Sequence, residues 1–210
     1  MTGRKKQKIG ILGGTFNPVH LGHLILARDA LERFGLDRIL FIPCFLPPHK
    51  PVRGLVSDAG RLAMLRAAVR GERKFSVSTV ELERGGISYT IDTVQALQRR
   101  YPRARLHFII GSDTLPELHS WRRIGELLTK VTFLTIERPG FRLEDMTARR
   151  LRLPKPWPAI LARTVFRGHR VEISSSDIRR RVAAGLPIRY LVPPSVARYI
   201  EIRKYYEQET

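Results

Sequence analysis

Two histidines and two glycines stand close together near the start of the chain, in the run GGTFNPVHLGH of residues 13–23. Adjacent glycines let the backbone turn sharply and approach a ligand with no Cβ in the way. His20 and His23 are three residues apart, so at the start of a helix they lie on one face and could reach the same group. The N–H groups and the dipole of a helix start also favour an anion. This run therefore indicates phosphate binding.

A second candidate anion site lies near the other end of the chain, in the run ISSSDIR of residues 173–179. Ser174 and Asp177 have the spacing of a capping box, which predicts a helix start. Arg179 would then fall in the first turn, where its charge opposes the helix dipole. An arginine in that position is favourable if an anion binds beside it.

A different interpretation of the histidines is half of a zinc site. It lacks a third ligand in the sequence, because Cys44 and the other histidines stand alone, and we predict no protein-held metal. Cys44 is also the one cysteine, so no internal disulfide can form. A single cysteine suits a reducing cytoplasm, where we expect the protein.

Short apolar runs alternate along the chain with amphipathic segments of helix length, which predicts an α/β fold with a parallel sheet. The predicted strands are Lys8–Leu12, Arg38–Pro43, Phe75–Glu81, Leu106–Gly111, Val131–Ile136 and a sixth around Thr164–Val171. The predicted helices are Gly22–Phe34, Asp58–Val69, Thr90–Tyr101, Arg122–Leu128, Ser175–Ala184 and Pro194–Tyr206. Ligands of such sheets bind beyond the carboxyl ends of the strands.

The chain of 210 residues has the length of one domain, and we expect a single domain over residues 1–210. Residues 174–210 are expected to form its C-terminal helical part. Residues 140–158 are rich in Arg and Pro and show no clear period, so we expect a loop or a small excursion there. No apolar run reaches the roughly 18 residues of a membrane span, so no membrane association is expected.

Four further stretches fall at predicted strand ends or helix starts, on the edge where ligands bind. They are Pro47–Lys50, Ser88–Thr93, Gly111–Asp113 with Trp121 shortly after, and Arg138–Gly140. Trp121 could stack on a flat ring, and the N–H groups of Tyr89 and Thr90 could receive a carboxylate. Lys50 and Arg138 are candidate partners for phosphate or carboxylate charge, and Asp113 could accept from ribose hydroxyls.

The first run resembles the T/HxGH signature of the nucleotidyltransferase superfamily, and residues 173–179 resemble its ISSTxIR motif with Ser176 in place of Thr. The order of the middle stretches is similar to that of bacterial nicotinate-nucleotide adenylyltransferases. The resemblance implies a Rossmann-like, doubly wound sheet with helices on both faces. It also implies adenylyl transfer from ATP to nicotinate mononucleotide, giving deamido-NAD and pyrophosphate in NAD biosynthesis, with Mg²⁺ entering with ATP.

The resemblance assigns roles to particular residues of this sequence. The catalytic set, which would supply the positive groups, is His20, His23, Lys50 and Arg179. The ATP-binding set is Gly13, Gly14, Thr15, Phe16, His20, His23, Gly111, Asp113, Ile173, Ser174, Ser175 and Arg179. The acceptor-binding set is Asn17, Lys50, Ser88, Tyr89, Thr90, Trp121 and Arg138. Many relatives have Asp at the position of Asn17, so a metal-ligand role there is not indicated.

Two alternatives remain open. An adenylyltransferase for nicotinamide mononucleotide would need a pocket for a neutral amide. A nucleic-acid-binding or regulatory module on the same fold would explain the formal net charge of +19, from 38 Lys and Arg against 19 Asp and Glu. We favour a solvated basic surface, because the basic residues are spread along the chain and no nucleic-acid-binding motif accompanies them. A homo-oligomer is compatible with the sequence.

Overall fold

The computed structural model describes residues 6–48, 54–138 and 140–207, and its centre is a six-stranded sheet. The strands are β1 (Lys8–Gly14), β2 (Arg38–Pro43), β3 (Phe75–Val77), β4 (Arg105–Gly111), β5 (Thr132–Ile136) and β6 (Val165–Phe166). Their order is β3-β2-β1-β4-β5-β6, and every neighbouring pair is parallel. The winding therefore reverses between β1 and β4, which is where an open α/β sheet leaves a crevice for ligands.

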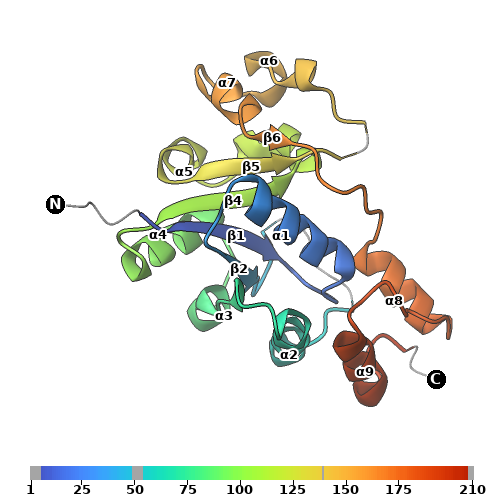
Figure 1. Ribbon diagram of the computed structural model, residues 1–210. Coiled ribbons are helices and arrows are strands. Elements are labelled where there is room, and N and C mark those ends of the chain that lie inside the picture. The colour runs from blue at the N-terminus through green and yellow to red at the C-terminus, as the bar shows by residue number, and fades with distance from the viewer. Residues whose placement is uncertain (1–5, 49–53, 139, 208–210) are drawn as a thin grey trace.

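Helices cover both faces of this sheet (Figure 1). On one face lie α1 (Leu21–Arg33), α2 (Asp58–Val69), α8 (Ser175–Ala183) and α9 (Pro194–Arg203). On the other lie α4 (Thr90–Arg100), the 3-10 helix η1 (Ser112–Ser120), α5 (Ile124–Lys130), α6 (Ala148–Leu151) and α7 (Trp157–Ala162). The short α3 (Val80–Arg84) follows β3, and η2 (Leu143–Asp145) precedes α6. The expected doubly wound architecture is confirmed.

The alternation of side chains along the strands explains the two layers. In β2, Ile39 and Phe41 pack into the core beneath α1, whereas Leu40 and Ile42 pack into the core beneath α4. All four side chains are at most 2% exposed. A parallel strand buried on both faces needs a continuous apolar run, and Arg38–Pro43 supplies it.

Most predicted elements agree with the structure to within a few residues, and β2 and α2 agree at both ends. The prediction of a strand over Phe75–Glu81 is wrong after Val77, because Val80–Arg84 forms α3. The Thr79 carbonyl accepts from the Glu83 N–H there, as in a helix. The predicted sixth strand shrinks to Val165–Phe166, and the last helix ends at Arg203.

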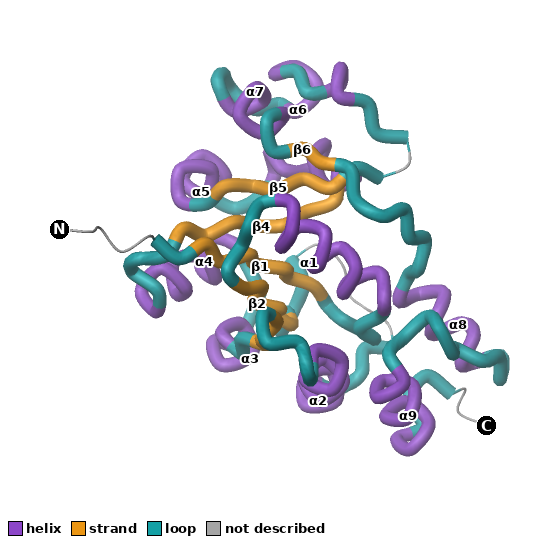
Figure 2. Tube along the Cα trace, in the orientation of Figure 1, coloured by secondary structure: helices purple, strands orange, loops and turns teal. Residues whose placement is uncertain are grey.

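The segment 140–158 is an excursion beyond β5, but it contains short helices rather than a plain loop. Figure 2 shows it as alternating purple and teal at one end of the molecule. Met146, Leu151 and Leu153 are buried against the core beneath α4 and α5. The arginines between these residues interrupt the apolar pattern, so sequence analysis predicted no helix here.

A fully buried arginine donates hydrogen bonds to three loops at the ligand edge of the sheet. Arg61 of α2 is 0% exposed. Its guanidinium donates to the carbonyls of Thr15 at 2.8 Å, Cys44 at 2.7 Å and Val56 at 3.2 Å, and it pairs with Asp58. Thr15 follows β1 and Cys44 follows β2, so Arg61 fixes how these two strand ends face each other.

Replacing Arg61 with Met should therefore lower the free energy of unfolding by about 3–5 kcal/mol, since it leaves buried carbonyls without donors. Arg66→Met, on the exposed side of the same helix, is the matched control and should stay within about 0.5 kcal/mol of the parent. Urea unfolding of the three proteins measures both effects. Equal stability of the two variants would contradict this role for Arg61.

Candidate active site

The two histidines of the first run lie side by side at the start of α1. Their ring centroids are 3.7 Å apart, and His20 is 6% exposed. The backbone N–H of His20 donates to Nδ1 of His23 at 3.2 Å, so the proton of a neutral His23 ring is on Nε2. The ring of Phe16 packs edge-on against His23 with centroids 5.0 Å apart. His23 thus has a fixed tautomer and a fixed orientation.

Both imidazoles are uncharged at neutral pH. Burial, followed by the charge of Arg138, lowers the pKa of His20 to about 4. Burial, followed by His20 and Arg138, holds the pKa of His23 well below its ordinary value. Without a bound anion both rings are therefore neutral, whereas the sequence-based hypothesis counts them among the positive groups of the site. They are N–H donors, and Nδ1 of His20 is buried with no hydrogen-bond partner within the described part of the chain.

The backbone at the start of α1 is less open to a ligand than expected. The N–H of Leu21 donates to the carbonyl of Leu191 at 3.0 Å, and the N–H of His23 donates to the carbonyl of His20 at 3.0 Å. A Cβ on Gly22 would lie 3.0 Å from Nδ1 of His20. The backbone N–H groups of Leu21 and His23 are thus already paired, so a ligand here would take its hydrogen bonds from the imidazole rings. The absence of a Cβ at Gly22 leaves room for the His20 ring.

A cavity of about 570 Å³ opens at the carboxyl ends of β1 and β4, beside this histidine pair. Such a volume is in the ordinary range for small-molecule sites. From the predicted ATP set, its lining includes Gly13, Gly14, His23, Gly111 and Asp113. From the predicted acceptor set, it includes Ser88, Tyr89, Thr90, Trp121 and Arg138. Residues far apart in the sequence thus face one space.

The residues of the second run support the first loop from outside this cavity. Ser175 Oγ donates to the carbonyl of Pro18 at 2.8 Å, and Arg179 Nη1 donates to the carbonyl of Asn17 at 2.8 Å. Ser174 Oγ accepts from the Asp177 N–H at 3.1 Å, which confirms the predicted cap. Ile173 packs against the core beneath α1. These contacts place α8 against the start of α1 (Figure 1).

Thr15, Phe16 and Asn17 also lie in the wall rather than in the lining. Thr15 Oγ1 is 3.7 Å from Sγ of Cys44. Asn17 is 1% exposed, and its amide donates to the carbonyl of Gly54 at 3.0 Å. The amide oxygen accepts from the Val56 N–H at 3.2 Å and from the Tyr206 hydroxyl at 2.7 Å. The structure thus places the Asn17 side chain in support of the turn, outside the cavity lining that contains the other described residues of the predicted acceptor set.

Among the predicted cations, Arg138 lines the cavity at the end of β4. A Cβ on Gly111 would lie 3.2 Å from Nε of Arg138 and even closer to the Asp113 carboxylate, so both side chains crowd this strand end. Arg138 therefore lies beside residues of the predicted ATP set. Lys50 falls outside the described residues.

Two charged residues of the cavity lining, Glu81 and Arg122, were not selected by sequence analysis. Glu81 is 7% exposed, and Thr93 Oγ1 donates to its carboxylate at 2.6 Å. Burial, opposed by hydrogen bonds from Thr93 and Ser88, raises the pKa of Glu81. Sequence analysis did not select Glu81, because it was assigned to the predicted strand Phe75–Glu81. Arg122 directly follows Trp121, and its guanidinium carbon lies 4.5 Å from the centroid of the Tyr89 ring. Its position directly after Trp121, a predicted binding residue, could have identified Arg122 as a candidate.

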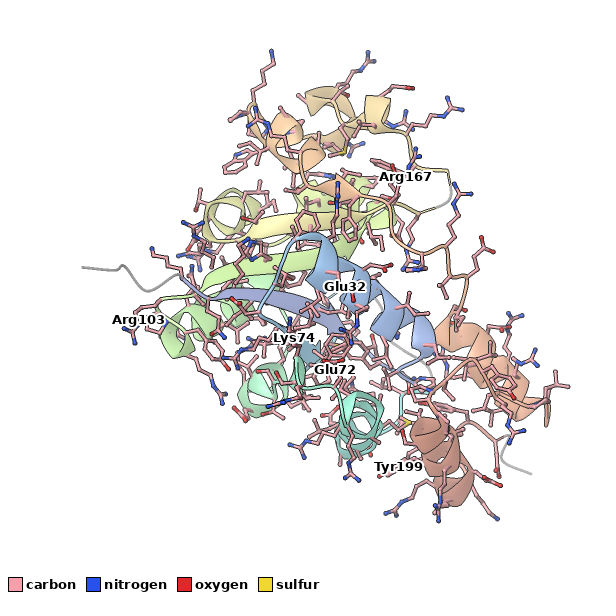
Figure 3. All side chains as sticks on the ribbon, viewed as in Figure 1. Glu32, Glu72, Lys74, Arg103, Arg167 and Tyr199 are labelled. Atoms are coloured by element: carbon pink, nitrogen blue, oxygen red, sulfur yellow. The ribbon has the colours of Figure 1, made fainter. Side chains whose placement is uncertain are left out.

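Over the described ranges, no group of three or more His, Cys, Asp and Glu side chains is arranged to hold a metal ion. Within the same part of the chain, none of the helices is both long and apolar enough to cross a membrane. Figure 3 shows the basic side chains Arg103 and Arg167 on separate parts of the molecule.

The lowered pKa of His20 predicts that acid destabilises the protein. Unfolded histidine takes up a proton near pH 6.5, whereas folded His20 does so at about pH 4, so stability falls as the pH drops between these values. The loss from His20 alone should approach about 3 kcal/mol at the acid end.

Urea unfolding at a series of pH values from about 7.5 down to about 4.5, which spans the titration of an unfolded histidine, measures this slope. His20→Asn should flatten the slope, and His119→Asn, at a partly exposed position outside the pair, should not. An unchanged slope in His20→Asn would contradict the assignment.

Comparison with known proteins agrees with the fold and identifies the family. Residues 11–181 match the model of the Cytidylyltransferase-like family. A protein of Opitutus terrae described as a probable nicotinate-nucleotide adenylyltransferase is 45% identical, over 95% of this chain and 97% of its own. One of Pelobacter propionicus with the same description is 42% identical, over 96% and 99%.

Solved structures share the fold. A Plasmodium falciparum nicotinic acid mononucleotide adenylyltransferase complexed with NaAD superimposes with a TM-score of 0.70 at 21% identity, over 95% of this chain and 97% of that one. The same enzyme complexed with APC gives a TM-score of 0.69 at 19% identity, over 95% and 97%. The chain therefore belongs to the cytidylyltransferase-like family and, within it, to the family of the nicotinate-nucleotide adenylyltransferases.

Proposed function

We propose that this protein transfers the adenylyl group of ATP to the 5′-phosphate of nicotinate mononucleotide, producing nicotinate adenine dinucleotide and pyrophosphate. The supporting observation is the cavity that joins His23 and Asp113 to Tyr89, Thr90 and Trp121. The relatives named for this activity match the chain over almost its whole length. This reaction needs both nucleotides in one space with the two phosphates adjacent, and a cavity with these two ends suits that requirement.

The reaction is a direct in-line displacement. An oxygen of the acceptor phosphate forms a bond to the α-phosphorus of ATP, and the bond from that phosphorus to the bridging oxygen breaks, so that pyrophosphate leaves with the electron pair. Transfers of this kind depend on positioning and on stabilising the developing charge. Nε2–H of His23 donates a hydrogen bond into the cavity, and Arg138 supplies positive charge at the same end.

The remaining groups position the substrates. Asp113 accepts from the ribose hydroxyls of ATP at the end of β4, as a strand-end acid does in related folds. Lys50 and Arg179 are proposed as further cations for the phosphates. Mg²⁺ is proposed to arrive with ATP, because the oxygens of the nucleotide phosphates commonly hold it and the described side chains include no carboxylate cluster for it.

The neutral state of the histidines fits this role. A buried pair of adjacent imidazolium groups would be costly without an anion, and the lowered pKa values of both rings avoid that cost. Bound triphosphate brings negative charge next to the rings and favours their protonated forms. Positive charge on the histidines would then develop only with the substrate.

The first test follows pyrophosphate release with ATP, Mg²⁺ and either nicotinate or nicotinamide mononucleotide. We expect release with the acid. His23→Ala should lose on the order of 10²–10³ in rate, and His23→Gln, which keeps an N–H donor, should lose less. Thermal unfolding verifies that both variants fold.

Release with the amide only would overturn the acceptor and keep the reaction type. Release with neither would favour a nucleic-acid-binding module, for which the +19 charge is the supporting observation. That module predicts RNA or duplex binding with a steep salt dependence that survives mutation of His20 and His23.

A further inference from the structure

The charged groups of the cavity lining have different neighbours. Among the described lining residues these groups are Glu81, Asp113, Arg122 and Arg138. Arg138 and Asp113 crowd Gly111, next to the histidine pair. Arg122 lies over Tyr89 at the start of α4. The cation at the aromatic end of the cavity, within the described residues, is thus Arg122.

The position of the Arg122 side chain leaves its donors available. Its guanidinium carbon lies 4.5 Å from the centroid of the Tyr89 ring, within the roughly 6 Å of a cation–π contact. A guanidinium has its N–H groups in a flat fork that matches a carboxylate. Along the described ranges Arg122 has no carboxylate within ion-pair distance, whereas the adjacent Arg123 pairs with Glu126.

The neighbours of Arg122 favour a flat ligand. The Trp121 ring is held edge-on by Phe108 and Phe133, with centroid separations of 5.9 and 6.1 Å. Trp121 and Tyr89 both line the cavity, and both belong to the part of the core around Phe108. A planar ring seated against Trp121 would present its edge substituent to residues beside Tyr89.

The buried carboxyl of Glu81 adds negative charge to the cavity lining, and Arg84 is a cation near it that does not line the cavity. Glu81 lines the same cavity and is held by Thr93. A second carboxylate entering beside it would meet like charge in a partly desolvated space. A neutral amide would meet no such penalty. A cation in the lining that faces the ligand would therefore favour an acid over an amide here.

We propose that Arg122 is the specificity-determining residue for the acceptor, and that its guanidinium, stacked on Tyr89, pairs with the carboxylate on the nicotinate ring. The proposal rests on the proposed function. It assigns the preference for the acid over the amide to a side chain, in addition to the backbone N–H groups of Tyr89 and Thr90.

The test measures kcat/KM for nicotinate and nicotinamide mononucleotide, with ATP saturating, in the parent protein and in Arg122→Gln. Losing a charge-assisted hydrogen bond should lower kcat/KM for the acid by roughly 10–100-fold. The loss should appear mainly as a higher KM for the acid. The values for the amide and the KM for ATP should change little.

Arg122→Lys keeps the charge and loses the flat fork, so it should fall between the parent and Arg122→Gln. Arg123→Gln is the matched control, because that neighbouring arginine pairs with Glu126 and does not line the cavity. It should keep the acid-to-amide ratio of the parent. Thermal unfolding of each variant checks that the fold is intact.

The outcomes separate the two proposals. If the parent prefers the acid and Arg122→Gln keeps the same acid-to-amide ratio, Arg122 is not the determinant, and the proposed function stands. If Arg122→Gln loses equally on both acceptors, Arg122 is a general structural residue and the inference is overturned. If the parent prefers the amide, or turns over neither compound, both proposals fail.

Discussion

The turn between β1 and α1 is the constraint on which the rest of the site depends. Its carbonyl groups face inward, and separate parts of the chain supply their donors: Arg61 to Thr15, Arg179 to Asn17, and Ser175 to Pro18. Buried carbonyls are costly when unpaired, so these donors are required for the turn to keep its shape. This turn fixes the positions of His20 and His23, which follow it directly. The C-terminal helix α8 therefore contributes to the site even where it does not line the cavity.

Burial of the same turn explains how the protein can keep two histidines in contact. Their lowered pKa values make them poor cations and good N–H donors at neutral pH. Positive charge along the described cavity lining comes from Arg138 at one end and Arg122 at the other. Each arginine also has an acidic group in its part of the lining, Asp113 beside Arg138 and Glu81 near the start of α4, and these acids limit the net charge of the cavity. Charge is thus arranged along the cavity, with each end suited to a different part of the substrates.

The two layers, the succession of elements along the chain and about half of the cavity lining could be predicted from the sequence, because these follow from local patterns. Apolar runs mark buried strands, and glycines and histidines after β1 mark an anion site.

The residues that sequence analysis missed act through distant partners. Arg61 looks like any helix arginine until Thr15 and Cys44 are seen around it. Glu81 fits an extended pattern, and α3 forms there only once β3 has ended at Val77. Asn17 was expected to meet substrate, and Tyr206 and Val56 are the partners that hold it in the wall.

A crystal structure of the protein with nicotinate adenine dinucleotide bound would test this arrangement of the site most directly. We expect the nicotinate ring against Trp121, with its carboxylate beside Arg122 and the start of α4. We also expect the two bridging phosphates within hydrogen-bond distance of His20 or His23, and the adenosine ribose at Asp113. A dinucleotide bound in the reverse direction, or outside the cavity between β1 and β4, would contradict the proposed site.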